Sequence, residues 1–193
     1  MNLKESIVLI KNEIKTIQKK KDLKSPVKII AVTKTHPFSI IKQCYKLQMF
    51  SIGENKIQEA ESKFESFEKM PKIERRFIGH LQSNKINKCL KLFDTIDTID
   101  SFRLAKKISN AALRINKKVK GLIQINTSEE IQKTGFYDYQ TEEINNCFKL
   151  PNLEIEGLMT IGPNTKNKNQ IREAFIKLGE LKNLINKNVE NKI

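Results

Sequence analysis

Cysteine is scarce in this 193-residue sequence: only Cys44, Cys89 and Cys147 are present, and no two of them form a C-x-x-C pair. Their wide spacing argues against a disulfide framework and against a zinc site, and it is typical of a protein from a reducing cytosol. We expect each cysteine to lie within a helix as a small apolar residue. The sequence therefore predicts a cytoplasmic protein without a metal site.

Long apolar runs are also missing. The apolar run at residues 7–10 is flanked by Lys4, Glu5 and Lys11. It is too short to span a bilayer, and no signal-peptide cleavage region accompanies it. We therefore expect no membrane interaction.

Acidic residues are few relative to basic ones, since 22 Asp and Glu stand against 36 Lys and Arg, and the net charge is +14. A positive charge of this size suits nucleic acid or an anionic surface. The charges are spread evenly, however, and no basic stripe interleaved with aromatic residues is present. This favours a bias in composition over a specific nucleic-acid site. A basic nucleic-acid-binding α/β domain stays as an alternative.

What the sequence does contain is a regular alternation of short apolar strands and amphipathic helices. The expected strands span residues 27–33, 49–52, 76–78, 95–99, 119–125 and 155–161. The expected helices span 4–22, a segment opened by Pro37, 54–69, two segments capped by Ser83 and Ser101, 140–149 and 169–187. Six strand–helix repeats with short connections predict a parallel sheet.

Two parallel architectures are consistent with this alternation: an open doubly wound sheet, and a (β/α)8 barrel without its last two units. No G-x-G-x-x-G motif follows the first strand, which argues against a dinucleotide-binding fold. A complete barrel needs about 250 residues. The 193 residues of this chain accommodate six units and not eight.

Lys34 stands at the carboxyl end of the first expected strand, just before the helix opened by Pro37. In parallel α/β folds, ligands and chemistry gather at this end of the sheet. A lysine beside an apolar wall can lose proton affinity and attack a carbonyl to form a Schiff base. Because the chain holds 36 Lys and Arg residues, an ordinary solvent-facing lysine is the competing interpretation.

Polar residues also follow each of the other expected strands, and these residues are Asn55, His80, Asp100, Asn126 and Thr160 with Gly162. Ends of loops are usually polar, so this feature alone is weak. Together with a lysine that can form an imine, it favours a site for an aldehyde cofactor.

Three longer segments resemble the pyridoxal phosphate (PLP) homeostasis proteins. These segments are AVTKT at residues 31–35, IGEN at 52–55 with QE at 58–59, and RFIGHLQSNK at 76–85. Shorter matches follow in the same order at residues 98–101, 124–126, 133–135 and 157–161. The resemblance extends from about residue 5 to the end of the chain.

The resemblance implies an α/β fold, namely a (β/α)8 TIM-type barrel of the alanine racemase N-terminal kind that is incomplete, with about six strand–helix units. It implies that Lys34 binds PLP as a Schiff base and that Asn55 faces the cofactor ring. His80 either forms a hydrogen bond at the site or caps the helix that begins at Ser83, and the structural role is favoured. Met159 packs against the ring or, as favoured here, fills the barrel interior.

The resemblance also implies a carrier or regulator of the PLP pool, with no catalytic residue of its own. The alternative is a PLP-dependent racemase or decarboxylase, which would need a second acid–base group from a further domain or subunit. Glu54 and Glu59 are expected to be solvated charges at the start of a helix, favoured there by the helix dipole.

Proteins of this family continue with two more strands, which hold the cofactor phosphate on backbone amides and place an arginine near the pyridine nitrogen. Phosphate binding after strands seven and eight is the general rule for barrels. The sequence contains none of these motifs, so residues 1–193 are expected to form a single, C-terminally truncated PLP-binding domain. Its first and sixth strands would be exposed edges, which predicts self-association or a complementing chain.

Overall fold

A six-stranded parallel sheet forms the centre of the computed structural model, which describes residues 2–64, 70, 72–128, 130, 132–189 and 192–193. The strands are β1 (Ala31–Val32), β2 (Ser51–Glu54), β3 (Glu74–Phe77), β4 (Thr95–Ile99), β5 (Val119–Gln124) and β6 (Leu153–Met159). They lie in the order β1-β2-β3-β4-β5-β6. Because sequence neighbours are sheet neighbours throughout, the sheet follows barrel topology and not the doubly wound alternative.

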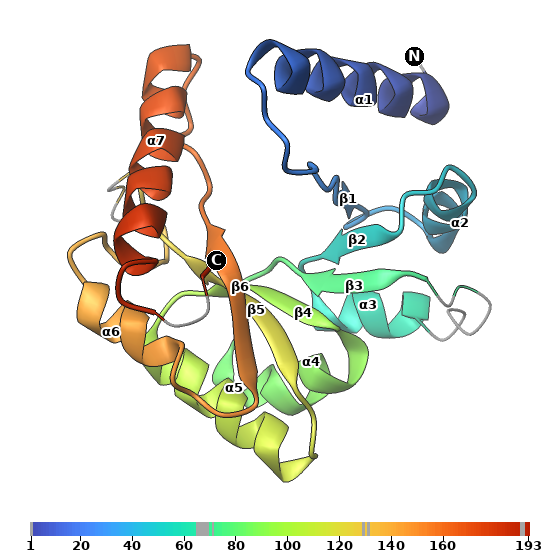
Figure 1. Ribbon diagram of the computed structural model, residues 1–193. Helices are drawn as coiled ribbons and strands as arrows, with labels where there is room; N and C mark the ends of the chain where they lie inside the picture. Colours follow the sequence, from blue (N-terminus) through green and yellow to red (C-terminus); the bar gives the residue numbers. More distant parts are fainter. Residues whose placement is uncertain (1, 65–69, 71, 129, 131, 190–191) are drawn as a thin grey trace.

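Helices α3 (Ile57–Phe64), α4 (Ile86–Leu92), α5 (Phe102–Arg114) and α6 (Thr141–Cys147) pack on the outer face of this sheet (Figure 1). The other helices are α1 (Leu3–Lys20), α2 (Phe38–Lys46) and α7 (Lys168–Ile185). The 3-10 turn η2 (Ser83–Lys85) precedes α4. Ser101 caps α5 as predicted, because the Leu104 amide donates to its hydroxyl at 3.3 Å. The C-terminal part of the predicted helix 54–69, residues 65–69, lies outside the described residues.

The main core lies between the sheet and helices α3 to α6. Phe93 packs edge-on against both Phe64 and Phe77, with ring centroids 5.3 and 5.2 Å apart. Each fully buried side chain of this size contributes about 1.5–3 kcal/mol through removal of apolar surface from water. All three cysteines are free and buried within helices, as predicted.

The N-terminal helix differs from the sequence prediction. Its isoleucine spacing predicts a buried face, but no described residue of α1 is buried, and Ile10 and Ile17 are 44% and 57% exposed. Phe175 on α7 is likewise exposed. Figure 1 shows the reason: α1 and α7 stand beyond the two edges of the sheet. The periodicity correctly predicted both helices, but the described residues bury no side chain of α1, whereas α7 buries Ala174, Leu181 and Ile185 and leaves Phe175 exposed.

The strands at the edges also differ in length and position from the prediction. Strand β1 covers two residues instead of 27–33, although the Thr33 amide extends its pairing by donating to Gly53 O at 3.0 Å. Strand β6 begins and ends two residues earlier than predicted. Each edge strand forms hydrogen bonds to a neighbouring strand on one side only. Pairing with that single neighbour therefore sets the bounds of the edge strand.

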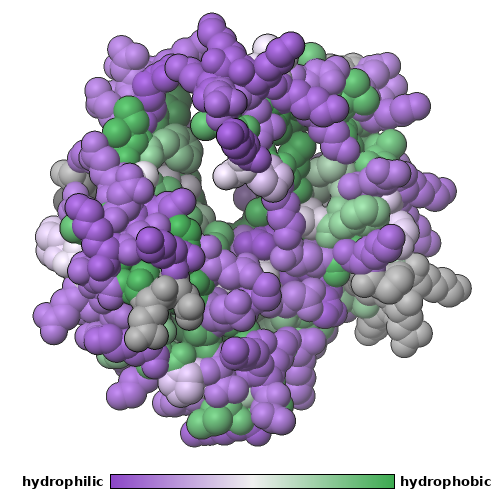
Figure 2. All heavy atoms as spheres, viewed as in Figure 1, coloured by the Kyte–Doolittle hydropathy of each residue, from purple (hydrophilic) through white to green (hydrophobic). Residues whose placement is uncertain are grey.

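The described strands form an incomplete barrel, as predicted, because β1 does not pair with β6. Figure 2 shows the resulting hollow, which opens between the α1 side and the α7 side of the molecule. Among the described helices, none is both long and apolar enough to cross a membrane.

Charged side chains fill part of the inner face. Arg76 pairs with Asp97 at 2.8 Å and with Glu74 at 3.1 Å, while Lys28 lies 2.6 Å from Glu74. Burial opposes ionisation of Glu74, but hydrogen bonds from Lys28 and Ser51 and the charge of Arg76 outweigh it and lower the pKa of Glu74 to about 2. Burial raises the pKa of Asp97 in spite of its bonds with Arg76. This network links the segment before β1 with β2, β3 and β4.

Candidate functional site

The residues predicted to form a site lie at one rim of the sheet, where the parallel strands end. Lys34 follows β1 by two residues, Asn55 follows β2 directly, and His80 follows β3 by three residues. Asp100 and Thr160 directly follow β4 and β6. The structure thus brings together at one edge groups that are far apart in the sequence.

The Lys34 side chain is exposed, and no described residue forms an ion pair or hydrogen bond with it. The strand sets the direction of the residues before it: Lys28 faces the inner side because it contacts Glu74, and Val32, paired with Gly53, lies on the same side. Lys34 lies two residues further on, in the turn after β1, so its exposed side chain stands at the rim where the strands end.

The backbone on both sides of Lys34 is held by charged side chains. Lys63 on α3 donates to Thr33 O at 2.9 Å, and the Thr35 amide donates to Glu59 Oε1 at 2.5 Å. Lys63 also pairs with Glu54 at 2.9 Å and with Glu59 at 2.7 Å.

The prediction that Glu54 and Glu59 are solvated charges at a helix start is therefore wrong for Glu54, whereas Glu59 does lie in the first turn of α3 but is paired with Lys63. Glu54 lies in β2 and is 0% exposed, while the Glu59 side chain is 23% exposed. Lys63, which the sequence analysis missed, neutralises both. Two signals pointed to it: the i,i+4 spacing of Glu59 and Lys63, and an acidic residue within a strand that is otherwise buried.

Asn55 and Gly79 show how closely the ends of β2 and β3 approach. A Cβ atom on Gly79 would lie 2.1 Å from Asn55 O, so this position accepts no side chain. The Thr98 hydroxyl donates to Gly79 O at 2.5 Å and ties β4 to the same point. The Asn55 Oδ1 atom is buried and has no hydrogen-bond partner among the described residues. An unsatisfied buried acceptor at the rim is a group that a bound molecule would satisfy.

His80 does not cap the helix, so that part of the sequence interpretation is wrong. Gln82 precedes the 3-10 turn and its side chain makes no capping bond, and Ser83, the predicted cap, lies within the turn. Instead, His80 Nδ1 lies 3.1 Å from Asp100 Oδ2, which links the ends of β3 and β4. The His80 side chain is 59% exposed and so is accessible from the rim.

Met159 ends β6 opposite Gln124 of β5. The Thr160 hydroxyl, directly after Met159, donates to Ile125 O at 2.8 Å, which locks the two strand ends together. A cavity of about 230 Å³ lies here and is lined by Gln124, Ile125, Asn126, Gln132, Lys133, Thr134 and Ile161. Lys133 closes it by donating to Gly162 O at 2.8 Å.

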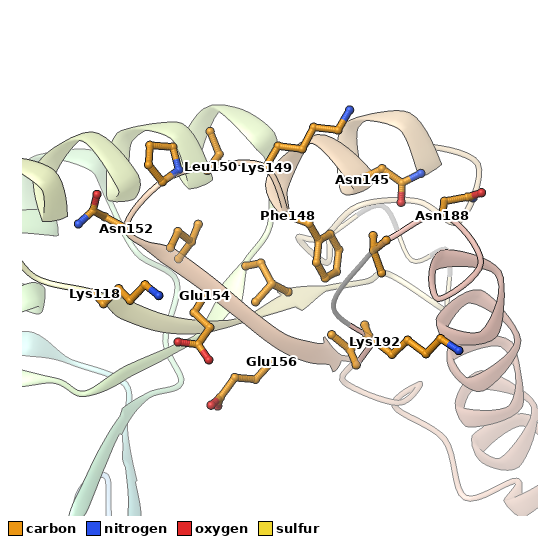
Figure 3. Close-up of a pocket in the computed structure, with 15 residues that line it drawn as sticks. Lys118, Asn145, Phe148, Lys149, Leu150, Asn152, Glu154, Glu156, Asn188 and Lys192 are labelled. Carbon is orange, nitrogen blue, oxygen red and sulfur yellow. The ribbon is translucent and has the colours of Figure 1, made fainter.

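A cavity of about 1110 Å³ lies elsewhere, along the unpaired side of β6 and beneath the C-terminal residues (Figure 3). Glu154 and Glu156 from the first half of β6 and Lys192 from the chain end line it. None of the residues predicted for the site lines this cavity, so size alone does not identify the functional site. In the described part of the chain, no cluster of His, Cys, Asp and Glu is arranged to hold a metal ion.

Comparison with known proteins shows the family to which this chain belongs. The family model of the alanine racemase N-terminal domain matches residues 9–193. A pyridoxal phosphate homeostasis protein of Haemophilus influenzae is 35% identical over 187 residues, which cover 94% of this chain and 78% of that protein. A pyridoxal phosphate homeostasis protein of Helicobacter pylori is 34% identical over 153 residues, covering 78% of this chain and 68% of that protein.

Solved structures agree with this assignment. PipY of Synechococcus elongatus without PLP has a TM-score of 0.85 at 25% identity, over 97% of this chain and 83% of PipY. PipY with PLP bound has a TM-score of 0.74 at 27% identity, over 88% and 81%. An alanine racemase of Clostridium difficile shares the fold alone, with a TM-score of 0.72 at 17% identity over 89% of this chain and 46% of the racemase. The chain therefore belongs to the alanine racemase N-terminal domain family and, within it, to the pyridoxal phosphate homeostasis proteins.

Proposed function

We propose that this protein binds PLP at the rim, through a Schiff base on Lys34, and acts in intracellular PLP homeostasis as a carrier. The observation that carries the proposal is the Lys34 amine, which is exposed at the strand ends without a partner among the described residues. PLP supplies an aldehyde that condenses with a lysine amine. The names of the relatives and the solved PipY structure with PLP bound support the same cofactor.

The other predicted residues fit roles around such a ligand. Asn55 faces the cofactor with an acceptor that lacks a described partner. Gly79 lets the ends of β2 and β3 approach closely, because a Cβ atom there would lie 2.1 Å from Asn55 O. His80, accessible and paired with Asp100, contributes a hydrogen bond at the rim. Met159 forms part of the inner wall at the end of β6.

The experiment that tests the Schiff-base assignment is borohydride reduction in the presence of PLP, followed by peptide mapping. We expect a pyridoxyl label on Lys34 in the natural sequence and its loss in Lys34→Ala. Lys28→Ala is the matched control, because Lys28 precedes the same strand but is paired with Glu74 at 2.6 Å. Labelling spread over surface lysines, at equal levels in Lys34→Ala, would overturn the proposal.

We further propose that the protein is not an enzyme. The relatives are named for homeostasis and not for a reaction. The alternative of a PLP-dependent racemase or decarboxylase gains support from the His80–Asp100 pair, which could move a proton at the rim. The test is incubation with PLP and common amino acids, with PLP alone as control. Turnover that depends on both Lys34 and His80 would establish the enzyme; turnover equal to the PLP control is the expected result.

Self-association is a separate proposal. The edges of the described sheet, β1 and β6, each pair with one strand only, and unpaired edges promote association between chains. Sedimentation over a range of concentrations should show oligomers, and a monomer at all concentrations would contradict this. The cytoplasmic location and the absence of specific nucleic-acid binding stay predictions from the sequence.

A further inference from the structure

Three ionisable side chains meet between α3 and the ends of β1 and β2. Lys63 lies 2.9 Å from Glu54 Oε1 and 2.7 Å from Glu59 Oε1. Glu54 is fully buried and Lys63 is nearly so. Removing such charges from water is costly, and a buried ion pair seldom stabilises a fold more than apolar side chains of similar volume would. Stability alone therefore does not account for this cluster.

The hydrogen bonds of the cluster go to the backbone on either side of Lys34. The Thr33 hydroxyl donates to Glu54 Oε1 at 2.7 Å, and Lys63 donates to Thr33 O at 2.9 Å. The Thr35 amide donates to Glu59 Oε1 at 2.5 Å. Lys34 itself takes no part, so the cluster fixes the residues before and after it and leaves its amine free.

Thr35 provides an independent observation. Its φ is +64°, in the left-handed region, which a β-branched residue rarely adopts. Such a conformation persists only where the surroundings impose it, and it is frequent at ligand-binding sites. The Glu59 carboxylate accepts the Thr35 amide and is the described side chain that holds the Thr35 backbone. The hydrogen bond from Lys63 lowers the pKa of Glu59, so the acceptor stays ionised.

We propose that Lys63, Glu54 and Glu59 form a positioning clamp that sets the direction of Lys34 for PLP capture by fixing Thr33 and the strained Thr35. The proposal rests on the assignment of Lys34 as the PLP lysine. The clamp residues do not contact the cofactor. They act through the backbone, which reduces the conformational entropy that Lys34 loses when its amine is captured.

Glu59→Ala is the most direct test, because it removes the acceptor of the Thr35 amide while keeping the buried Lys63–Glu54 pair. Glu59→Gln keeps an oxygen that can accept the same hydrogen bond. Glu61→Ala is the matched control: Glu61 lies on the same helix and pairs with Lys88 at 3.5 Å on the surface. Two quantities are measured for each variant: the hydrogen-exchange rate of the Thr35 amide without PLP, and the dissociation constant for PLP.

In Glu59→Ala we expect the Thr35 amide to exchange faster and the PLP dissociation constant to rise about tenfold, because the backbone beside Lys34 must then be ordered when PLP binds. Glu59→Gln should recover part of both losses, and Glu61→Ala should match the natural sequence. If Thr35 exchange or PLP affinity is unchanged in Glu59→Ala, the clamp is wrong. If PLP labelling is unchanged in Lys34→Ala, the proposed function is wrong instead, so the two failures are distinguishable.

Discussion

Replacing Gly79 by alanine tests whether the close contact between β2 and β3 shapes the site. The added Cβ atom would lie 2.1 Å from Asn55 O, 2.8 Å from its carbonyl carbon and 2.9 Å from its Cα. All three are backbone atoms, so no side-chain rotation relieves the overlap. The strand ends are also joined by the Ile78 amide, which donates to Glu54 O at 2.9 Å. Alanine therefore forces the backbone at Asn55 away from β3.

The size of the effect follows from two terms. Forcing extra volume into a packed region costs about 1–3 kcal/mol. Displacing Gly79 also weakens the buried hydrogen bond that its carbonyl accepts from Thr98 at 2.5 Å, at a cost of about 1 kcal/mol. Together these give about 2–4 kcal/mol. For a chain of this size each kcal/mol changes Tm by about 2–4 °C, so Tm should fall by about 4–16 °C.

Thermal unfolding and PLP titration of the same samples provide the assay. Gly179→Ala is the control, because no atom lies within 4 Å of the Cβ added there, in the middle of α7. That change should raise stability by about 0.5–1 kcal/mol through helix propensity. Gly79→Ala should lower both Tm and PLP affinity. A Tm and an affinity equal to those of the natural sequence would refute the steric argument.

Three further predictions concern buried charge and the open edges. Lys63→Met leaves the buried Glu54 without its counter-charge, so the free energy of unfolding in urea should fall by about 3–5 kcal/mol. Adding Glu54→Gln should recover part of this loss, and no recovery would contradict the pairing. Because the pKa of Glu74 falls from 4.5 to about 2 in the fold, its stabilisation is present above pH 4.5 and is lost as the pH falls towards 2. The Tm difference between the natural protein and Glu74→Gln should therefore shrink from pH 7 to pH 3, and a constant difference would contradict this. Extending the chain by two strand–helix units from a longer relative should tighten PLP binding by several powers of ten through phosphate contacts. The same extension should reduce self-association. Equal affinity and equal oligomer content would refute both expectations.

Much of the fold followed from the sequence because short-range patterns determine it. Apolar strands alternating with helices leave few parallel topologies, and the carboxyl ends of such strands share one rim. Lys34 and Asn55 could therefore be placed at one edge from order alone. The Ser101 cap was also predictable, since its hydrogen bond to Leu104 is local.

The clamp was not predictable in the same way, because it depends on packing between elements. Glu54 was assigned to a helix start, and the structure places it in β2, where its carboxylate points to Lys63 nine residues away. The exposed face of α1 illustrates the opposite case. Isoleucine spacing predicts which side of a helix is apolar, but only the neighbouring elements decide whether that side is buried.

The arrangement around Lys34 is consistent with a carrier for a physical reason. A carrier must bind PLP firmly enough to hold it and still release it, so the amine has to remain accessible while the loss of entropy on binding stays small. Lys34 is exposed, and its flanking residues are fixed by Lys63, Glu54 and Glu59. The buried charged side chains thus contact the backbone beside Lys34 and not its amine. A racemase or decarboxylase would place a further proton-transfer group against the cofactor, and among the described rim residues His80 is the one suited to that task. Whether His80 only binds or also moves protons is what the turnover assay separates.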